Sequence, residues 1–153
     1  MIANNRDDKY LDKLIAQKFS ASFMNNVKWV KLISLTVANT SGFRKCLVKL
    51  IWEEQENLRE LLFDEDTEFD FNYYNSAMEA MVSGEPAGWY AYKEIEWLDF
   101  PGVIKDSTGS IMTKQDLQQI QNLLATIGEF ETEITADKLR IYCYRRKVTP
   151  NFS

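Results

Sequence analysis

The chain has 153 residues, of which 45% are hydrophobic and 27% charged, with a net charge of −5. This balance argues against disorder of the whole chain, and the length predicts a single globular domain over 1–153 with its own core. A pI near 4.9 argues against nucleic-acid binding.

The chain contains no histidine. This excludes Ser-His-Asp and Cys-His nucleophile activation, histidine-rich zinc sites and the commonest general base. Glycine-rich phosphate motifs of the forms GxGxxG and GxxxxGK[ST] are also absent. We therefore expect no cofactor and no metal, and an enzyme of this sequence would depend on carboxylates, Lys or Tyr.

The first residues carry charges at almost every turn and lack the basic start, apolar stretch and cleavage site of a secretory signal. No apolar run approaches the roughly 20 residues of a membrane span. We expect a cytoplasmic protein without membrane contact, with frayed ends at 1–6 and 148–153. Cys46 and Cys143 lie in apolar runs and are expected to be buried free thiols.

Hydrophobic periodicity and capping residues predict the elements in chain order. Helices are expected over 7–19 and 26–38, strands over 43–52 and 58–63, a helix over 72–83, a strand over 89–98, a helix over 114–127, and strands over 129–134 and 138–146. The order α-α-β-β-α-β-α-β-β predicts an α+β fold, a mostly antiparallel sheet with helices packed on it.

The sequence also predicts helix caps, the buried face of one helix and one pairing of strands. Asn25 or Asn26 is expected to cap the second helix, whose buried face would carry Trp29, Val30, Ile33 and Val37. Ser76 and Glu79 form a capping box for the helix over 72–83, and Thr113 and Asp116 form one for the helix over 114–127. The strand over 58–63 is expected to pair with 43–52.

An acidic segment, residues 53–70, holds nine carboxylates and one arginine, Arg59. Its net charge of −8 against −5 for the chain leaves about +3 on the rest. Three interpretations remain open: a charged edge that discourages aggregation, a surface for a basic partner, and a Ca²⁺ or Mg²⁺ loop, although the spacing of a calcium loop is missing. The partner-binding candidates are Asp64, Glu65, Asp66, Glu68 and Asp70.

The stretch GWYAYKEIEW, residues 88–97, offers the only catalytic candidates. On an extended strand Glu94 and Glu96 share a face about 7 Å apart with Tyr92, a separation at which two carboxylates could act as acid and base. The opposite face, with Trp89, Ala91, Ile95 and Trp97, is expected to build the core, and Lys93 on that apolar side is unexplained.

A basic group ends the chain, where Arg140, Arg145, Arg146 and Lys147 flank Tyr142 and Tyr144. Arginine and tyrosine together are typical of nucleic-acid stacking, but the acidic pI argues against it. These cations are expected either to pair with the acidic segment or to solubilise the final strand.

Three motifs resemble a small bacterial domain-of-unknown-function family. They are Trp29, Lys31 and Leu32 in an early helix, Tyr92 to Trp97 in a central strand, and Ile141, Tyr144 and Arg145 in a closing strand. Cys143 stands where that pattern has glycine. The resemblance covers 26–146, implies bacterial origin and supplies no activity or catalytic residues.

The leading hypothesis from the sequence is a non-enzymatic interaction domain that presents the acidic segment to a basic protein, in the manner of toxin-immunity proteins. Two alternatives remain: a small carboxylate-dependent hydrolase using Glu94 and Glu96, and a small-ligand module lined by aromatic residues around Trp89 and Trp97.

Overall fold

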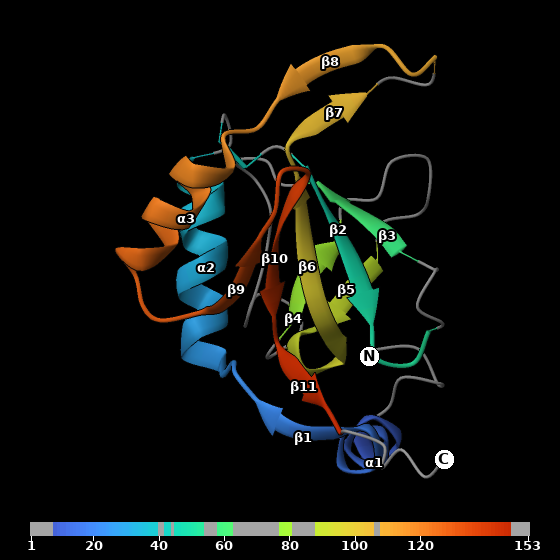
Figure 1. Ribbon diagram of the computed structural model, residues 1–153. Coiled ribbons are helices and arrows are strands. Elements are labelled where there is room, and N and C mark those ends of the chain that lie inside the picture. The colour runs from blue at the N-terminus through green and yellow to red at the C-terminus, as the bar shows by residue number, and fades with distance from the viewer. Residues whose placement is uncertain are drawn as a thin grey trace, which may run out of the picture.

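The computed structural model describes residues 8–39, 42–43, 45–53, 58–62, 77–80, 88–105 and 108–147. Helices and antiparallel strands are mixed in an α+β fold, as the sequence predicts (Figure 1). The carboxylates at 64–70 and both chain ends, 1–6 and 148–153, lie outside the described residues.

A five-stranded antiparallel sheet positions the candidate site. Its strand order is β3-β2-β6-β10-β9. The strands are β2 (Lys45–Leu50), β3 (Leu58–Leu62), β6 (Ile95–Pro101), β9 (Glu131–Ile134) and β10 (Lys138–Tyr142). The antiparallel pairing of β2 with β3 confirms the predicted contact between these two segments.

One face of this sheet is covered by the helices α2 (Asn26–Ala38) and α3 (Leu117–Ala125), which lie together on one side in Figure 1. Alternate strand residues point into that layer, as expected for a half-buried strand. The buried side chains of the sheet on this face include Cys46, Val48, Leu50, Ile95, Leu98, Phe100, Leu139 and Ile141. They pack with the buried side chains of the helices, among them Trp29, Leu32, Ile33, Ile120 and Leu124.

A smaller two-stranded sheet closes one end of the molecule. It pairs β1 (Phe19–Ser22) with β11 (Tyr144–Arg146), and α1 (Asp8–Lys18) lies beside it (Figure 1). The sequence did not predict β1, because the apolar spacing of the helix continues into Phe19. At the opposite end, β7 (Val103–Lys105) and β8 (Ile111–Lys114) form a hairpin that was also not predicted.

The predicted second helix is confirmed over 26–38, and the side chain of Asn25 caps it by accepting a hydrogen bond from Lys28 N at 2.8 Å. Its buried face differs, since Leu32 and Thr36 are buried where Val30 and Val37 were expected. The helix predicted from residue 114 begins at Leu117, and Asp116 rather than Thr113 is its cap.

The helix predicted over 72–83 is wrong for its described part. Residues Ala77–Ala80 form the strand β4, which pairs antiparallel with β5 (Gly88–Ala91). Helix propensity is a weak preference that pairing with a neighbouring strand overrides. The proposed cap, Ser76, lies outside the described residues.

The continuous strand predicted over 89–98 is also wrong. A turn of 3-10 helix, Tyr92–Glu94, separates β5 from β6. This turn breaks the alternation on which the two predicted faces depended, because residues before and after it no longer share a pleat. The prediction placed Tyr92, Glu94 and Glu96 on a solvent-exposed strand face. In the structure these three side chains are buried, as is Leu98.

Candidate functional site

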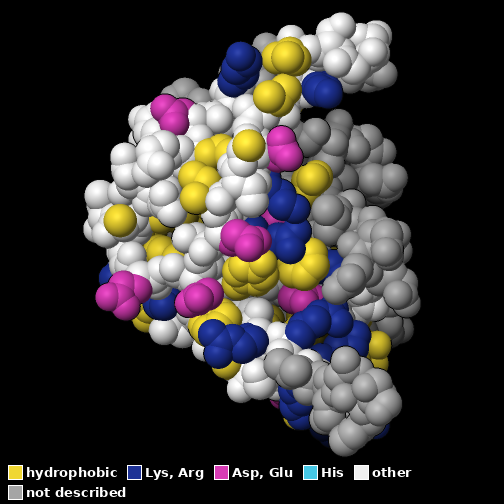
Figure 2. Space-filling model, viewed as in Figure 1, with side chains coloured by type: hydrophobic (Ala, Val, Ile, Leu, Met, Phe, Trp, Pro, Cys, Tyr) yellow, Lys and Arg dark blue, Asp and Glu magenta, His cyan; other side chains and the backbone are white. Residues whose placement is uncertain are grey.

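The face of the five-stranded sheet opposite α2 and α3 carries charged and aromatic side chains. Cross-strand register aligns Lys49, Trp97 and Tyr142 in one row across β2, β6 and β10. Asp99 and Arg140 lie opposite each other in the adjacent row. Figure 2 shows basic, acidic and hydrophobic side chains interspersed over this region of the surface.

Asp99 and Arg140 form a bidentate ion pair at the centre of this face. Arg140 donates from Nε to Asp99 Oδ1 at 2.6 Å and from a terminal nitrogen to Oδ2 at 2.9 Å. The same guanidinium lies 4.0 Å from the ring centroid of Trp97. A bidentate pair stacked on an aromatic ring fixes the orientation of all three groups.

Glu96 holds a second, nearly buried ion pair at a bulge in β6. The register shift between Lys49 and Leu50 leaves Glu96 without a partner in β2. Its carboxylate accepts two hydrogen bonds from Arg146, at 2.6 and 2.8 Å, and lies 3.3 Å from Lys49 Nζ. The bulge therefore aims this carboxylate at cations from two other strands.

Lys49 is fully buried, with an exposed fraction of 0%. Its ammonium donates to the backbone oxygens of Leu50 and of Glu53, the latter at 2.6 Å, as well as contacting Glu96. Burial lowers the pKa of Lys49, while the contact with Glu96 raises it in part. The three acceptors satisfy the three donors of the ammonium, as a buried charge requires.

The remaining catalytic candidates serve other contacts. Glu94 accepts a hydrogen bond from Trp52 Nε1 at 2.8 Å. Tyr92 stacks on Trp29, with ring centroids 5.2 Å apart, inside the helix-covered core. The 3-10 turn directs Lys93 outward, where its ammonium pairs with Asp12 at 3.0 Å, so its predicted place on an apolar face is wrong.

This arrangement does not favour acid-base chemistry between Glu94 and Glu96. Each carboxylate is engaged by different donors, Trp52 for the first and Arg146 with Lys49 for the second. Arg146 contacts both oxygens of Glu96 and Lys49 contacts one of them, so a substrate would compete with these two cations for the carboxylate.

The predicted burial of the two thiols is confirmed, since Cys46 and Cys143 are both buried and free. Burial raises the pKa of each thiol, and nearby carboxylates, Asp99 and Glu96 respectively, raise it further. The thiolate is the reactive form, so neither cysteine is set up as a nucleophile.

Within the described ranges, no three His, Cys, Asp or Glu side chains converge as a metal site. In the same part of the chain, no helix is long and apolar enough to cross a membrane.

Sequence reasoning missed the roles of Lys49 and Asp99 and the partners of Arg140 and Arg146. Among the described residues, these two arginines pair with Asp99 and Glu96. A usable signal was present, because single charges inside apolar strands are seldom buried unless paired. The segments 43–52, 89–99 and 138–146 contain such charges, among them Lys49, Glu96, Asp99 and Arg140.

Among the hollows that the described residues form near the end of β1, two are large enough for a small molecule. The larger, about 800 Å³, is lined by residues from β1, α2, α3 and β9, including Lys28. Lys28 is engaged there by the backbone oxygens of Phe23 and Glu129, at 3.0 and 2.7 Å. The smaller, about 370 Å³, lies beside Trp97, Tyr142 and Arg146.

Comparison with known proteins assigns the chain to a family. A model described as a family of unknown function, DUF6678, matches residues 11–148. The chain belongs to this family. The DUF6678 match spans most of α1, all of α2 and α3, the five-stranded sheet and both arginine–carboxylate pairs, and it bears out the expected domain-of-unknown-function family. No curated protein and no solved structure matches the chain.

Proposed function

We propose that the protein is a non-enzymatic interaction domain that presents its acidic segment, residues 53–70, to a basic protein partner. The observation that carries this proposal is the uneven charge: −8 within the segment and about +3 over the rest of the chain. Concentrated charge of one sign speeds the encounter with an oppositely charged surface and disfavours wrong partners. The contacting residues would be Asp64, Glu65, Asp66, Glu68 and Asp70.

The position of the segment in the sequence supports this role. Residues 64–70 closely follow β3, which is an edge strand of the five-stranded sheet. At the other end of the segment, Glu53 binds Lys49 through its backbone oxygen at 2.6 Å. The acidic segment thus starts from a buried ion-pair cluster, a rigid base from which to present charge.

The state of the other carboxylates also favours binding over catalysis. Glu94, Glu96 and Asp99 are buried and each accepts hydrogen bonds from the protein itself. A hydrolase based on Glu94 and Glu96 remains the alternative. It would have to displace Trp52 and Arg146 from the two carboxylates before either could meet a substrate.

The proposal extends to the cellular setting. The free cysteines fit a reducing compartment, the cytoplasm, and the family resemblance suggests a bacterial source. The partner class would be a basic toxin or nucleic-acid enzyme, with the domain acting as its immunity protein. This partner class rests on analogy of charge and size.

Affinity purification from native cells tests the proposal. The bait would be the full chain, and the matched bait would carry the four neutral substitutions D64N, D66N, E68Q and D70N. We expect a basic protein that is retained by the first bait at low salt and depleted from the second. Equal recovery of the same partners by both baits would remove the acidic segment from the function.

A further inference from the structure

The smaller hollow has the walls of an aromatic binding site. Four aromatic side chains line it: Phe23, Trp97, Tyr142 and Tyr144. They come from β6, β10, β11 and the residue after β1, so both sheets contribute to the walls. A volume of about 370 Å³ lies at the lower end for small-molecule sites and suits one or two fused rings.

The charges around this hollow point to a single negative charge on its ligand. Arg146 lines the hollow but is already paired with Glu96. Arg145 also lines it, is exposed, and lies 5.1 Å from the Phe23 ring without an ion pair in the described part of the chain. Glu131 adds a carboxylate to the walls, which disfavours a dianion such as a phosphate.

The indole N–H of Trp97 is a second, independent indication of a binding site. The exposed fraction of Trp97 is 8%, and its buried indole Nε1–H has no hydrogen-bond partner among the residues that the structure describes. A buried donor without an acceptor is uncommon and costs about 1–3 kcal/mol. This N–H is itself buried in the wall, so a ligand whose acceptor atom reached it would lower that cost only after a shift of the indole ring.

We propose that this hollow binds a small planar aromatic monocarboxylate. The ring would pack among Trp97, Tyr142 and Tyr144, and the carboxylate would pair with Arg145. Stacking on aromatic walls and one charge-assisted hydrogen bond to arginine are the interactions that such a compound needs. This site uses no residue of 53–70, so it extends the proposed function without resting on it.

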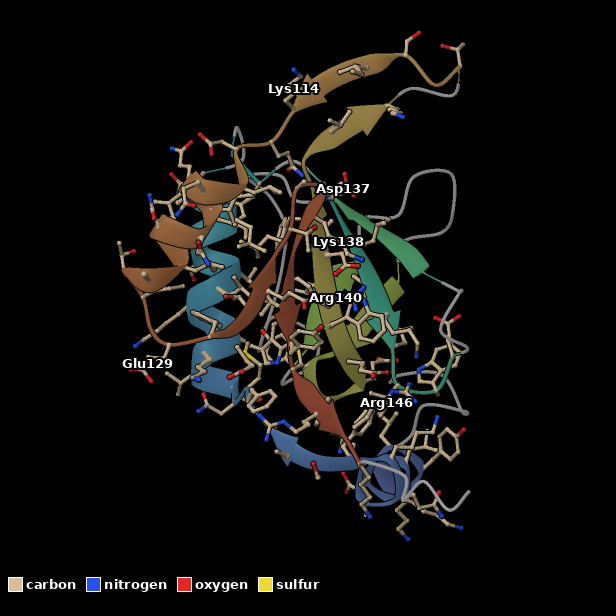
Figure 3. All side chains as sticks on the ribbon, in the orientation of Figure 1. Lys114, Glu129, Asp137, Lys138, Arg140 and Arg146 are labelled. Atoms are coloured by element: carbon tan, nitrogen blue, oxygen red, sulfur yellow. The ribbon has the colours of Figure 1, made fainter. Side chains whose placement is uncertain are left out.

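Calorimetric titration of the full chain with 2-naphthoate tests the site. We expect one binding event per chain, with 2-naphthamide binding about tenfold or more weakly because it lacks the charge. Arg145→Gln should weaken 2-naphthoate binding by about tenfold. Lys114→Gln removes an equal charge from the far hairpin, away from Arg146 in Figure 3, and should leave binding unchanged.

A nuclear magnetic resonance titration places the ligand. The Trp97→Phe variant identifies the indole N–H signal of Trp97, because that signal is missing from its spectrum. In the wild-type protein this signal should shift as 2-naphthoate is added. The inference is overturned if 2-naphthoate does not bind, if Arg145→Gln binds it as tightly as wild type, or if 2-naphthyl phosphate binds more tightly. Arg145 is exposed, so its variant is expected to fold even where Trp97→Phe does not.

Discussion

Glu96 shows how a single buried carboxylate organises this protein. Its exposed fraction is 2%, yet it meets Arg146 from β11 and Lys49 from β2. Withdrawing such ions from water costs several kcal/mol each, and the cost is recovered only when all partners are present. The cluster therefore links β2 and β6 of the five-stranded sheet to β11 of the two-stranded sheet.

Glu96→Gln is expected to lower the free energy of unfolding by about 2–4 kcal/mol, because Lys49 would remain buried without a counter-charge. The lower end reflects the side chain of Arg146, which is 40% exposed and can be solvated. Urea denaturation at pH 7 measures this change. Glu129→Gln, on an exposed carboxylate (Figure 3), is the control and should change stability by less than about 0.5 kcal/mol.

The buried thiols predict a loss of stability at alkaline pH. Both have a pKa raised above the ordinary value of 9.0, so the unfolded chain loses these protons while the folded chain keeps them. The stabilisation is complete below pH 9 and falls above it, by up to about 1.4 kcal/mol per pH unit for each thiol.

Urea denaturation between pH 8 and 10 checks this dependence against a Cys46→Ala, Cys143→Ala double variant. The double variant is less stable at every pH but should show a flatter decline. The lowered pKa of Lys49 makes stability rise with pH, the opposite of the thiol effect. Lys49 is present in both proteins, so its contribution cancels from the comparison. Parallel curves for the two proteins would refute the role assigned to the thiols.

Residue patterns predicted burial better than they predicted partners. Cys46, Val48 and Leu50 share the core face that alternation assigns to them. Alternation failed at Glu94 because the 3-10 turn over Tyr92–Glu94 contains no glycine or proline that would mark it. Cross-strand partners also depend on register, which the bulge at Glu96 shifts and which the local sequence does not display.

At the scale of elements, α2 shows how a local sequence signal places residues in the core. Its cap, Asn25, accepts from Lys28 N at 2.8 Å and satisfies one of the free backbone donors at the helix start. The same helix brings Trp29, Leu32 and Ile33 to the core face of the sheet. Fraying of its first turn would loosen Trp29 and with it the stacked ring of Tyr92.

Asn25→Ala is expected to destabilise the protein by about 1 kcal/mol, since the helix loses a capping acceptor. Asn25→Asp keeps an acceptor at the same position and should restore nearly all of that stability. Thermal unfolding followed by circular dichroism measures both variants. An Asn25→Asp protein as unstable as Asn25→Ala would mean that the cap is not the source of the effect.

Elements with strong local signals were predictable, and elements made by pairing were not. The capping asparagine and apolar spacing located α2 over its full length. By contrast, Ala77–Ala80 reads as a helix from its composition and becomes a strand through pairing with Gly88–Ala91. The hairpin over Val103–Lys114 and the strand β1 are likewise defined by partners distant in sequence or by a turn, not by local periodicity.

At the scale of the whole molecule, charge is separated between the acidic segment and the remainder. The candidate site found in the structure, the face with Trp97, Arg140 and Arg146, holds most of its charges in internal pairs. The ion pairs of Arg140 and Arg146 could not be predicted from the sequence, whereas the acidic segment is evident from the sequence alone. We propose different tasks for the two features: binding of a small anionic ligand for the first, and binding of a basic protein for the second.

Association kinetics with the purified basic partner test the central claim most directly. Stopped-flow rates would be measured at about 20 and 200 mM salt for the wild type and for the D64N, D66N, E68Q, D70N variant. The wild-type rate constant should fall steeply with salt, and the variant should associate about tenfold or more slowly at low salt with a flatter dependence. Equal rate constants for the two proteins at low salt would contradict the account.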